Sequence, residues 1–347
     1  MKKLSLLAAT LFSFATIMSA CSSSNDTEAS GNKGDDTITI AWYPNESGED
    51  LKDARDEIAK VIEDATGKKV EHKTTTDYII AIESIANGNA DLAFMGAQGY
   101  IEANNKNDKV QPLVVPSGAS GTLDDAVYHS WISVKKGNED QFKDGDDFKI
   151  DHIVDKKFSF VSNSSTSGFK VPSEGIVSYF NEKDKYKDLK QEDLLEGGKF
   201  FSEVLYGGSH QGSAVNLLTG KADVAAFCDT CVKNYVELAD GEENTAGAVY
   251  KVMDNAAEPF NSIPGEEFVV ISVTPVLNAP FTCNSETLSE EDYKAIKEAF
   301  LSDEVTNNQN IFVPKDAETG GLFTKTADER FVEVEDSWFD PIRELSK

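Results

Sequence analysis

Basic residues are scarce in this sequence: 33 lysines and arginines stand against 61 aspartates and glutamates, which gives a formal net charge of −28. Nucleic acids and anionic lipid surfaces are bound mainly by clusters of basic side chains that neutralise phosphates. The acidic balance therefore excludes both classes of partner. It does not exclude a small anion, because fixed N–H and O–H dipoles in a desolvated cleft act at short range.

Long apolar runs are also few. The run from Leu4 to Met18 is too short to cross a bilayer, and it follows Lys2 and Lys3 as in an export signal. It ends in small residues before Cys21, which resembles the lipobox of bacterial lipoproteins. We predict a signal peptide over residues 1–20, lipidation of Cys21, and a polar, flexible tether over residues 21–36. The folded part would then be exported and anchored to the outer face of the cell membrane, with plain secretion as the alternative.

Strand and helix patterns alternate from the end of this tether onward. Residues 37–44 read as a strand, 49–66 as a helix, 70–75 as a strand, 77–88 as a helix and 90–96 as a buried strand. This order predicts an α/β fold with parallel strands.

One short pattern occurs twice. Gly88-x-Ala90-Asp91 returns as Gly220-Lys221-Ala222-Asp223, each time before an apolar strand. Two lobes of similar design explain this repeat, although a helix-to-strand turn that α/β proteins reuse would also give it. Taking the apolar strand at 268–273 as the return crossing, we predict lobe 1 over residues 37–134 and 268–347, and lobe 2 over residues 135–267.

A hydroxyl-rich turn lies near the middle of the chain. The strand-like run 158–161 is followed by Ser164-Ser165-Thr166-Ser167, Gly168, and a helix opened by Pro172. The first turn of a helix presents unpaired N–H groups and a partial positive charge, to which hydroxyls add further donors for an anion. Simple N-capping by these side chains is the alternative.

Three motifs in order carry a family resemblance. Ser165-Thr166-Ser167-Gly168-x-x-x-Pro172, a Gly-x-x-His turn ending in His210, and Gly220 to Ala225 resemble the phosphonate and phosphite binding proteins of ABC importers, over about Thr37 to Asp303. The resemblance implies a two-lobed periplasmic-binding-protein-like fold of type II. Each lobe would be a mainly parallel sheet flanked by helices, with the ligand cleft between the lobes.

The same resemblance implies the function and the site. The protein would capture a phosphonate, phosphite or phosphate oxyanion and deliver it to an ABC permease, as a monomer without cofactor, metal or enzymatic activity. The residues implied to bind ligand are Ser165, Thr166, Ser167, His210, Tyr78 and Tyr128.

Two acids that hold the amine of aminophosphonates in that family are less well matched. One falls near Asp229 or Thr230, while the segment from Val276 to Pro280, where the other is expected, contains no acid. Because burying an unpaired ammonium costs several kcal/mol, we predict an oxyanion that lacks an amine, such as phosphite, phosphate or a simple alkylphosphonate.

The remaining cysteines are Cys228, Cys231 and Cys283. In an exported protein a disulfide is favoured over a metal site, and Cys228 with Cys231 is the preferred pair. The Cys-x-x-Cys spacing also fits a redox or zinc motif, for which a fourth zinc ligand is missing. A surface sensor or thiol-exchange protein is one alternative function. A serine hydrolase using Ser165 or Ser167 with His210 and Asp229 is another, although no Gly-x-Ser-x-Gly elbow is present.

Overall fold

The fold is seen in a computed structural model that describes residues 36–145, 147–315, 317 and 320–345. The predicted signal peptide, Cys21 and nearly all of the tether lie outside these residues. Within the described ranges, no helix has both the length and the apolar character needed to cross a membrane.

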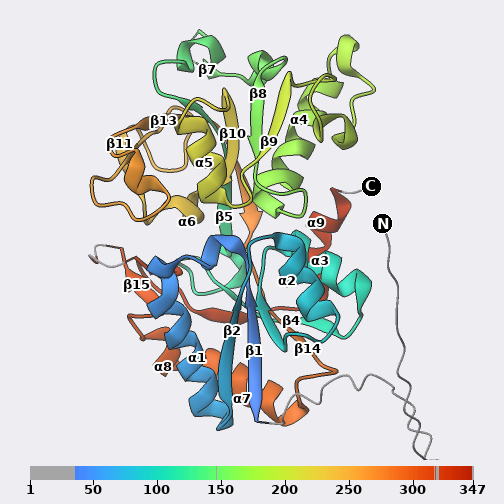
Figure 1. Ribbon diagram of the computed structural model, residues 1–347, viewed down its shortest axis with the longest axis vertical. Coiled ribbons are helices and arrows are strands. Elements are labelled where there is room, and N and C mark those ends of the chain that lie inside the picture. The colour runs from blue at the N-terminus through green and yellow to red at the C-terminus, as the bar shows by residue number, and fades with distance from the viewer. Residues whose placement is uncertain (1–35, 146, 316, 318–319, 346–347) are drawn as a thin grey trace, which may run out of the picture. The chain divides into compact units, whose positions relative to one another are not determined.

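Two mixed β-sheets organise the described chain (Figure 1). In the first sheet β1 pairs in parallel with β2 and β3, whereas β14 and β17 add antiparallel pairs. The strands of this sheet, in spatial order, are β17 (Phe331–Glu333), β4 (Val110–Pro116), β14 (Phe281–Asn284), β3 (Leu92–Phe94), β1 (Thr37–Trp42) and β2 (Lys69–Thr74).

The second sheet has the same mixed character. Strand β8 pairs in parallel with β9 and β10, and the other pairs are antiparallel. Its spatial order is β11 (Val236–Asp240), β12 (Val249–Val252), β13 (Glu267–Leu277), β5 (Val127–Lys135), β10 (Val224–Cys228), β8 (Lys157–Phe160) and β9 (Glu203–Tyr206). Two small sheets pair β6 (Lys143–Asp144) with β7 (Asp147–Phe148), and β15 (Phe312–Pro314) with β16 (Phe323–Lys325).

The α/β class and the two sheets are confirmed, but parallel pairing is confined to part of each sheet. The long strands β5 and β13 pair antiparallel from Phe268 to Leu277 in the second sheet, with one irregularity between Val270 and Ser272. Residues 117–126 connect β4 to β5, and residues 278–280 connect β13 to β14. The chain therefore passes between the sheets at two neighbouring places, and the strands that make these passages run against their neighbours.

Successive side chains of each strand point to opposite faces of its sheet, and helices cover both faces. In β1, Ile38, Ile40 and Trp42 face α1 (Lys52–Thr66) and α7 (Glu290–Phe300), while Ala41 faces the opposite cluster. That cluster contains side chains of α2 (Tyr78–Ala86), α3 (Ala97–Lys106) and α9 (Asp340–Glu344). The second sheet is covered in the same way by α4 (Val171–Asn181) and α5 (His210–Leu218). Two further helices, α6 (Asp229–Val232) and α8 (Asp303–Thr306), are short.

The repeated Gly-x-Ala-Asp turn has the same geometry in both sheets. Asp91 accepts a hydrogen bond from the N–H of Thr39 on β1 at 2.8 Å, and Asp223 accepts one from the N–H of Lys157 on β8 at 2.9 Å. In each case the carboxylate ties the turn to the start of the neighbouring parallel strand. The repeat thus marks the same helix-to-strand turn in two similarly built halves.

Candidate functional site

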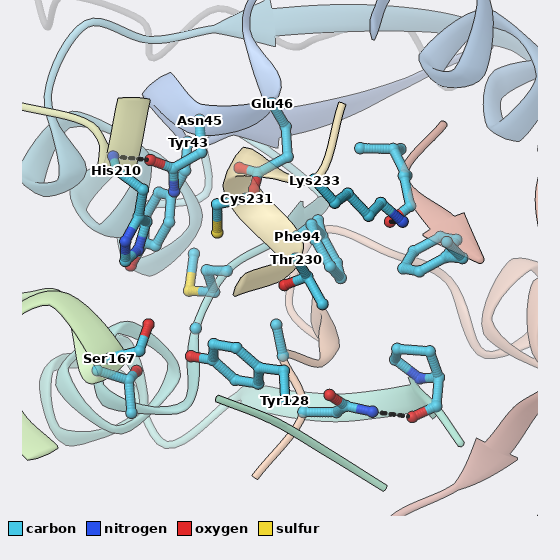
Figure 2. A pocket seen from close by; sticks show the side chains of 18 of the residues that line it. Tyr43, Asn45, Glu46, Phe94, Tyr128, Ser167, His210, Thr230, Cys231 and Lys233 are labelled. Carbon is cyan, nitrogen blue, oxygen red and sulfur yellow. Dashed lines mark hydrogen bonds between the residues drawn. The ribbon is translucent and has the colours of Figure 1, made fainter. Parts of the chain in front are cut away.

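A cavity of about 210 Å³ lies between the two sheets (Figure 2). The first sheet contributes the segment after β1, the start of α2 and the end of β3 to its lining. The second sheet contributes β5, the hydroxyl turn, the start of α5 and the segment at α6. Six of the residues predicted to bind ligand line the cavity together: Tyr78, Tyr128, Ser165, Thr166, Ser167 and His210.

The hydroxyl turn both caps a helix and lines the cavity. Ser165 Oγ accepts a hydrogen bond from the N–H of Gly168 at 3.1 Å, and Ser130 Oγ donates to the carbonyl of Ser167 at 2.6 Å. Thr166 Oγ1 accepts from the N–H of Gln98, in the first turn of α3, at 2.9 Å. These bonds do not use the hydroxyl protons of Ser165, Thr166 and Ser167, which leaves them able to donate to an anion.

Gly96 permits the close approach of the turn to α3. A Cβ atom at this position would lie 2.7 Å from Thr166 Oγ1, closer than real contacts allow. The residue stands between β3 and α3 and lines the cavity. A glycine is therefore required where the two sheets meet at the site.

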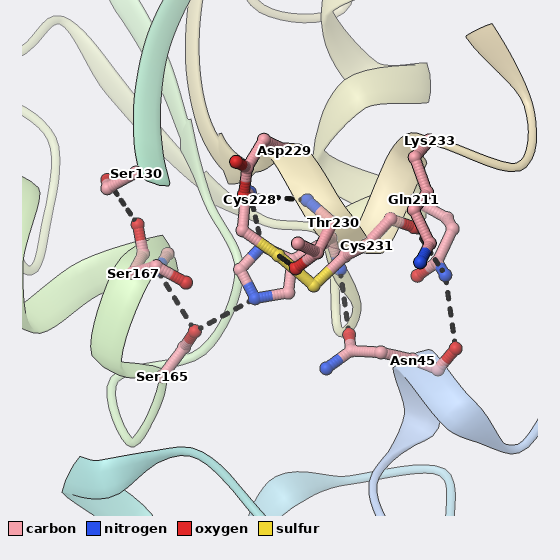
Figure 3. The surroundings of a disulfide bond; sticks show 12 residues. Asn45, Ser130, Ser165, Ser167, Gln211, Cys228, Asp229, Thr230, Cys231 and Lys233 are labelled. Carbon is pink, nitrogen blue, oxygen red and sulfur yellow. Dashed lines mark hydrogen bonds between the residues drawn. A yellow bond between two sulfur atoms is a disulfide. The ribbon is translucent and has the colours of Figure 1, made fainter. Parts of the chain in front are cut away.

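Hydrogen bonds with Cys228 and Ser165, both labelled in Figure 3, fix the tautomer of His210. Its Nδ1 accepts from the backbone N–H of Cys228 at 3.0 Å, and its Nε2 lies 3.4 Å from Ser165 Oγ. Because a backbone N–H can only donate, the proton of the neutral ring must sit on Nε2. Burial lowers the pKa of His210 from 6.5 to about 3, so the ring is neutral at physiological pH and presents an N–H donor.

The two predicted tyrosines are buried donors. Asn45 Nδ2 donates to the hydroxyl of Tyr78 at 2.7 Å, a bond that does not use the Tyr78 proton. Burial raises the pKa of Tyr78 and of Tyr128 well above 10, so both hydroxyls keep their protons.

Asp229 does not line the cavity. Its Oδ1 accepts from the backbone N–H of His129 at 2.9 Å, and its Oδ2 lies 2.9 Å from His129 Nδ1. The carboxylate is thus bound to β5 at the edge of the cleft. The structure places it apart from the six residues that do line the cavity.

Cys228 and Cys231 form a disulfide, which is the pair favoured by the sequence, and their Cα atoms are 5.4 Å apart. Cys283 is buried as a free thiol. The sulfurs of the disulfide lie within 4.8 Å of a His210 ring nitrogen, but disulfide sulfurs are not the thiolates that bind metals. The bridge holds the segment whose N–H orients His210.

Several polar lining residues were not predicted. Glu46 and Asn45 come from the turn after β1, and Lys233 follows α6. Burial raises the pKa of Glu46 to about 8, and burial lowers the pKa of Lys233 to about 8. The cavity therefore contains a carboxyl group and an amine in addition to its neutral donors.

Hydrogen bonds join the two sheets around the cavity. Asn45 Oδ1 accepts from the backbone N–H of His210 at 3.0 Å, and Tyr235 donates to Asp50 at 2.6 Å. Ser164 donates to Glu102 at 2.8 Å on the side of the hydroxyl turn. These bonds connect segments of the two sheets at the cavity.

Comparison with known proteins supports the resemblance to phosphonate-binding proteins of ABC importers. The family described as ABC transporter, phosphonate, periplasmic substrate-binding protein matches residues 40–339. The phosphate-import protein PhnD of Mycolicibacterium smegmatis is 31% identical over 243 residues, which cover 68% of this chain and 70% of that protein.

Two solved structures share the fold. A binding protein component of an ABC phosphonate transporter from Pseudomonas aeruginosa has a TM-score of 0.62 and 19% identity, covering 89% of this chain and 85% of that one. The PhnD1 protein of Prochlorococcus marinus, in complex with methylphosphonate, has a TM-score of 0.60 and 16% identity, covering 90% and 97%. Since the family match spans most of the sequence and the Mycolicibacterium relative extends over two thirds of it, the chain belongs to the phosphonate substrate-binding proteins of ABC importers.

Proposed function

We propose that the cavity binds the tetrahedral oxyanion of a phosphonate or phosphate, with oxygens held by the hydroxyl turn, Tyr78, Tyr128 and His210. The observation that carries this proposal is the tautomer of His210, whose Nε2–H is held towards Ser165 by the bond from Cys228. Together with the three hydroxyls and two phenols, it makes the wall of this end of the cavity a surface of donors. Desolvated dipoles of this kind bind an anion without a nearby cation.

We further propose that binding is coupled to closure of two lobes built around the two sheets. The lobe boundaries predicted from sequence, 37–134 with 268–347 against 135–267, remain a prediction, although β5 and β13 pair within the second sheet. The hinge would then lie at the two connections, 117–126 and 278–280. Closure around the oxyanion presents one defined shape to the permease.

We propose that the cleft has no hydrolase activity. In a Ser-His-Asp triad the histidine donates its Nδ1–H to the acid, which orients the ring to accept the serine proton at Nε2. Here Nδ1 of His210 accepts a bond from Cys228, and Asp229 is bound to His129. The serines therefore lack a general base.

We propose that the protein acts as a monomer anchored by lipid at Cys21. Stable anchoring requires more than one acyl chain, which lipidation of an N-terminal cysteine supplies. Mass spectrometry of the mature N-terminus should show a lipid-modified Cys21, and Cys21→Ala should release the protein from the membrane. An unmodified, freely secreted wild-type protein would contradict the anchor.

Isothermal titration calorimetry with phosphate and methylphosphonate tests the binding proposal. The wild type should bind at least one of them, and His210→Gln should weaken binding roughly 10- to 150-fold through loss of a bond to a charged group. His152→Gln, at an exposed histidine, is the matched control and should bind like the wild type. Absence of binding to both ligands, or equal affinity in His210→Gln, would refute the proposal.

A further inference from the structure

The cavity is larger than an oxyanion requires. A single water needs about 10–15 Å³ on this scale, so 210 Å³ holds roughly a dozen or more non-hydrogen atoms, against about five in methylphosphonate. Besides the hydroxyl turn, the lining includes a cluster of aromatic rings in which Phe323 lies 5.6 Å from Phe94 and from Phe312. The volume therefore leaves room for a substituent on the phosphonate.

Glu46 presents an unpaired carboxyl oxygen in this space. Its Oε2 is inaccessible to solvent and has no hydrogen-bond partner among the described residues. Arg55, whose charge lowers the pKa of Glu46 against the larger effect of burial, donates through Nη1 to the backbone carbonyls of Glu46 and Gly48 rather than to the carboxylate. Figure 2 shows the Glu46 side chain reaching from the turn after β1 towards Cys231, between the labelled His210 and Lys233 in this view.

Lys233 brings the opposite charge to the same cavity. Its Nζ donates to Thr324 Oγ1 at 2.6 Å and lies 3.4 Å from the carbonyl oxygen of Leu322. Both partners are neutral, and no carboxylate in the described part of the chain forms an ion pair with this ammonium, although the charge of Asp229 raises the pKa of Lys233 against the larger effect of burial. No salt bridge joins Glu46 to Lys233 in the described part of the chain, because Glu46 Oε2 has no partner there and Lys233 Nζ donates to Thr324 and Leu322.

We propose that the ligand is a phosphonate whose substituent carries both an ammonium and a carboxylate, with Glu46 binding the ammonium and Lys233 the carboxylate. This inference rests on the proposed function, which places the phosphonate oxygens at the hydroxyl turn. Buried charges are rarely retained without a partner, and a zwitterionic substituent supplies one to each. It replaces the expectation, based on the acid-free segment 276–280, of a ligand without an amine.

A phosphonate with only one of the two groups satisfies only half of this arrangement. The unmatched protein group must then be neutralised or stay desolvated without a partner, and this penalty separates such ligands from the zwitterion. Affinity should therefore rise when each group is added. The largest affinity requires both groups on one molecule.

Calorimetry on the wild-type protein tests this order without any mutation. The probes are methylphosphonate, 2-aminoethylphosphonate, 3-phosphonopropionate and 2-amino-4-phosphonobutyrate. The last, which carries both groups, should bind roughly tenfold or more tighter than methylphosphonate. Equal or weaker binding of the zwitterion, with methylphosphonate or phosphate still bound, would overturn the inference and leave the proposed function standing. Failure of phosphate and of all four phosphonates to bind would instead refute the proposed function.

Two variants test which protein side chain binds which group of the ligand. Glu46→Gln should lose the advantage of the amine-bearing probes, and Lys233→Met that of the carboxylate-bearing probes, while methylphosphonate affinity stays within about twofold. Glu49→Gln and Lys221→Met, at exposed positions, are the matched controls. Thermal melting confirms that each variant is folded. A uniform loss of affinity for every probe would overturn the assignment.

Discussion

Replacing Thr166 by valine tests the anion-binding end of the cleft at a single hydroxyl. Valine keeps the shape of threonine but removes the oxygen that accepts the Gln98 N–H at 2.9 Å and whose proton is available to the ligand. The change therefore removes one donor to an anion and leaves one N–H at the start of α3 without its acceptor.

The expected loss of affinity follows from the charge on the ligand. A hydrogen bond to a charged group contributes about 1.5–3 kcal/mol, which corresponds to a roughly 10- to 150-fold weaker Kd. Global stability should change less, because the Thr166–Gln98 bond joins the two sheets at the cleft and lies outside both cores.

Titration calorimetry with phosphate and methylphosphonate measures this loss. Thr219→Val is the matched control, because Thr219 is exposed at the end of α5 and its hydroxyl donates only to the carbonyl of Val215. If Thr166→Val binds both ligands within about twofold of the wild type, the hydroxyl turn is a helix cap and the anion binds elsewhere.

Three further outcomes are expected. Because His210 is neutral in the folded protein, its contribution to the free energy of unfolding is complete above pH 6.5. This contribution falls as the pH is lowered towards about 3, by at most about 1.4 kcal/mol per pH unit. Urea unfolding across this range should show the fall in the wild type, and His210→Gln should lack it. Without ligand, Glu46→Gln and Lys233→Met should each raise the free energy of unfolding at pH 7 by about 1–3 kcal/mol, and with it the melting temperature. The reason is that the folded wild type must neutralise or desolvate these two groups. Lower melting temperatures would contradict the interpretation that both groups lack a partner. Reducing the Cys228–Cys231 disulfide should lower the free energy of unfolding by about 2 kcal/mol. It should also weaken anion binding, because the bridge holds the Cys228 N–H that orients His210. An unchanged anion affinity in calorimetry after reduction would show that the bridge does not support the site.

Local sequence patterns were sufficient to predict the helices and strands and the residues at one end of the cleft. The hydroxyl turn, the glycine turn before His210 and the Gly-x-Ala-Asp repeat each combine strand, turn and helix signals within a few residues, so their local structure follows from short-range chemistry. The packing of the two sheets then brings Tyr78 and Tyr128 to the same cavity.

The positions of the charged groups required long-range information. Strand β10 pairs antiparallel with β5 in a register that sets Cys228 opposite Ser130, and Asp229 consequently meets His129 instead of the cavity. Glu46 is one of 61 acidic residues and lies in a short turn without a distinguishing pattern, so only the meeting of the two sheets identifies it.

A crystal structure of the protein with methylphosphonate is the most direct test of oxyanion binding between the sheets. The phosphonate oxygens should lie within about 3 Å of the hydroxyls of Ser165, Thr166 and Ser167 and of His210 Nε2. An ordered phosphonate bound elsewhere, with only water in the cleft, would contradict the account.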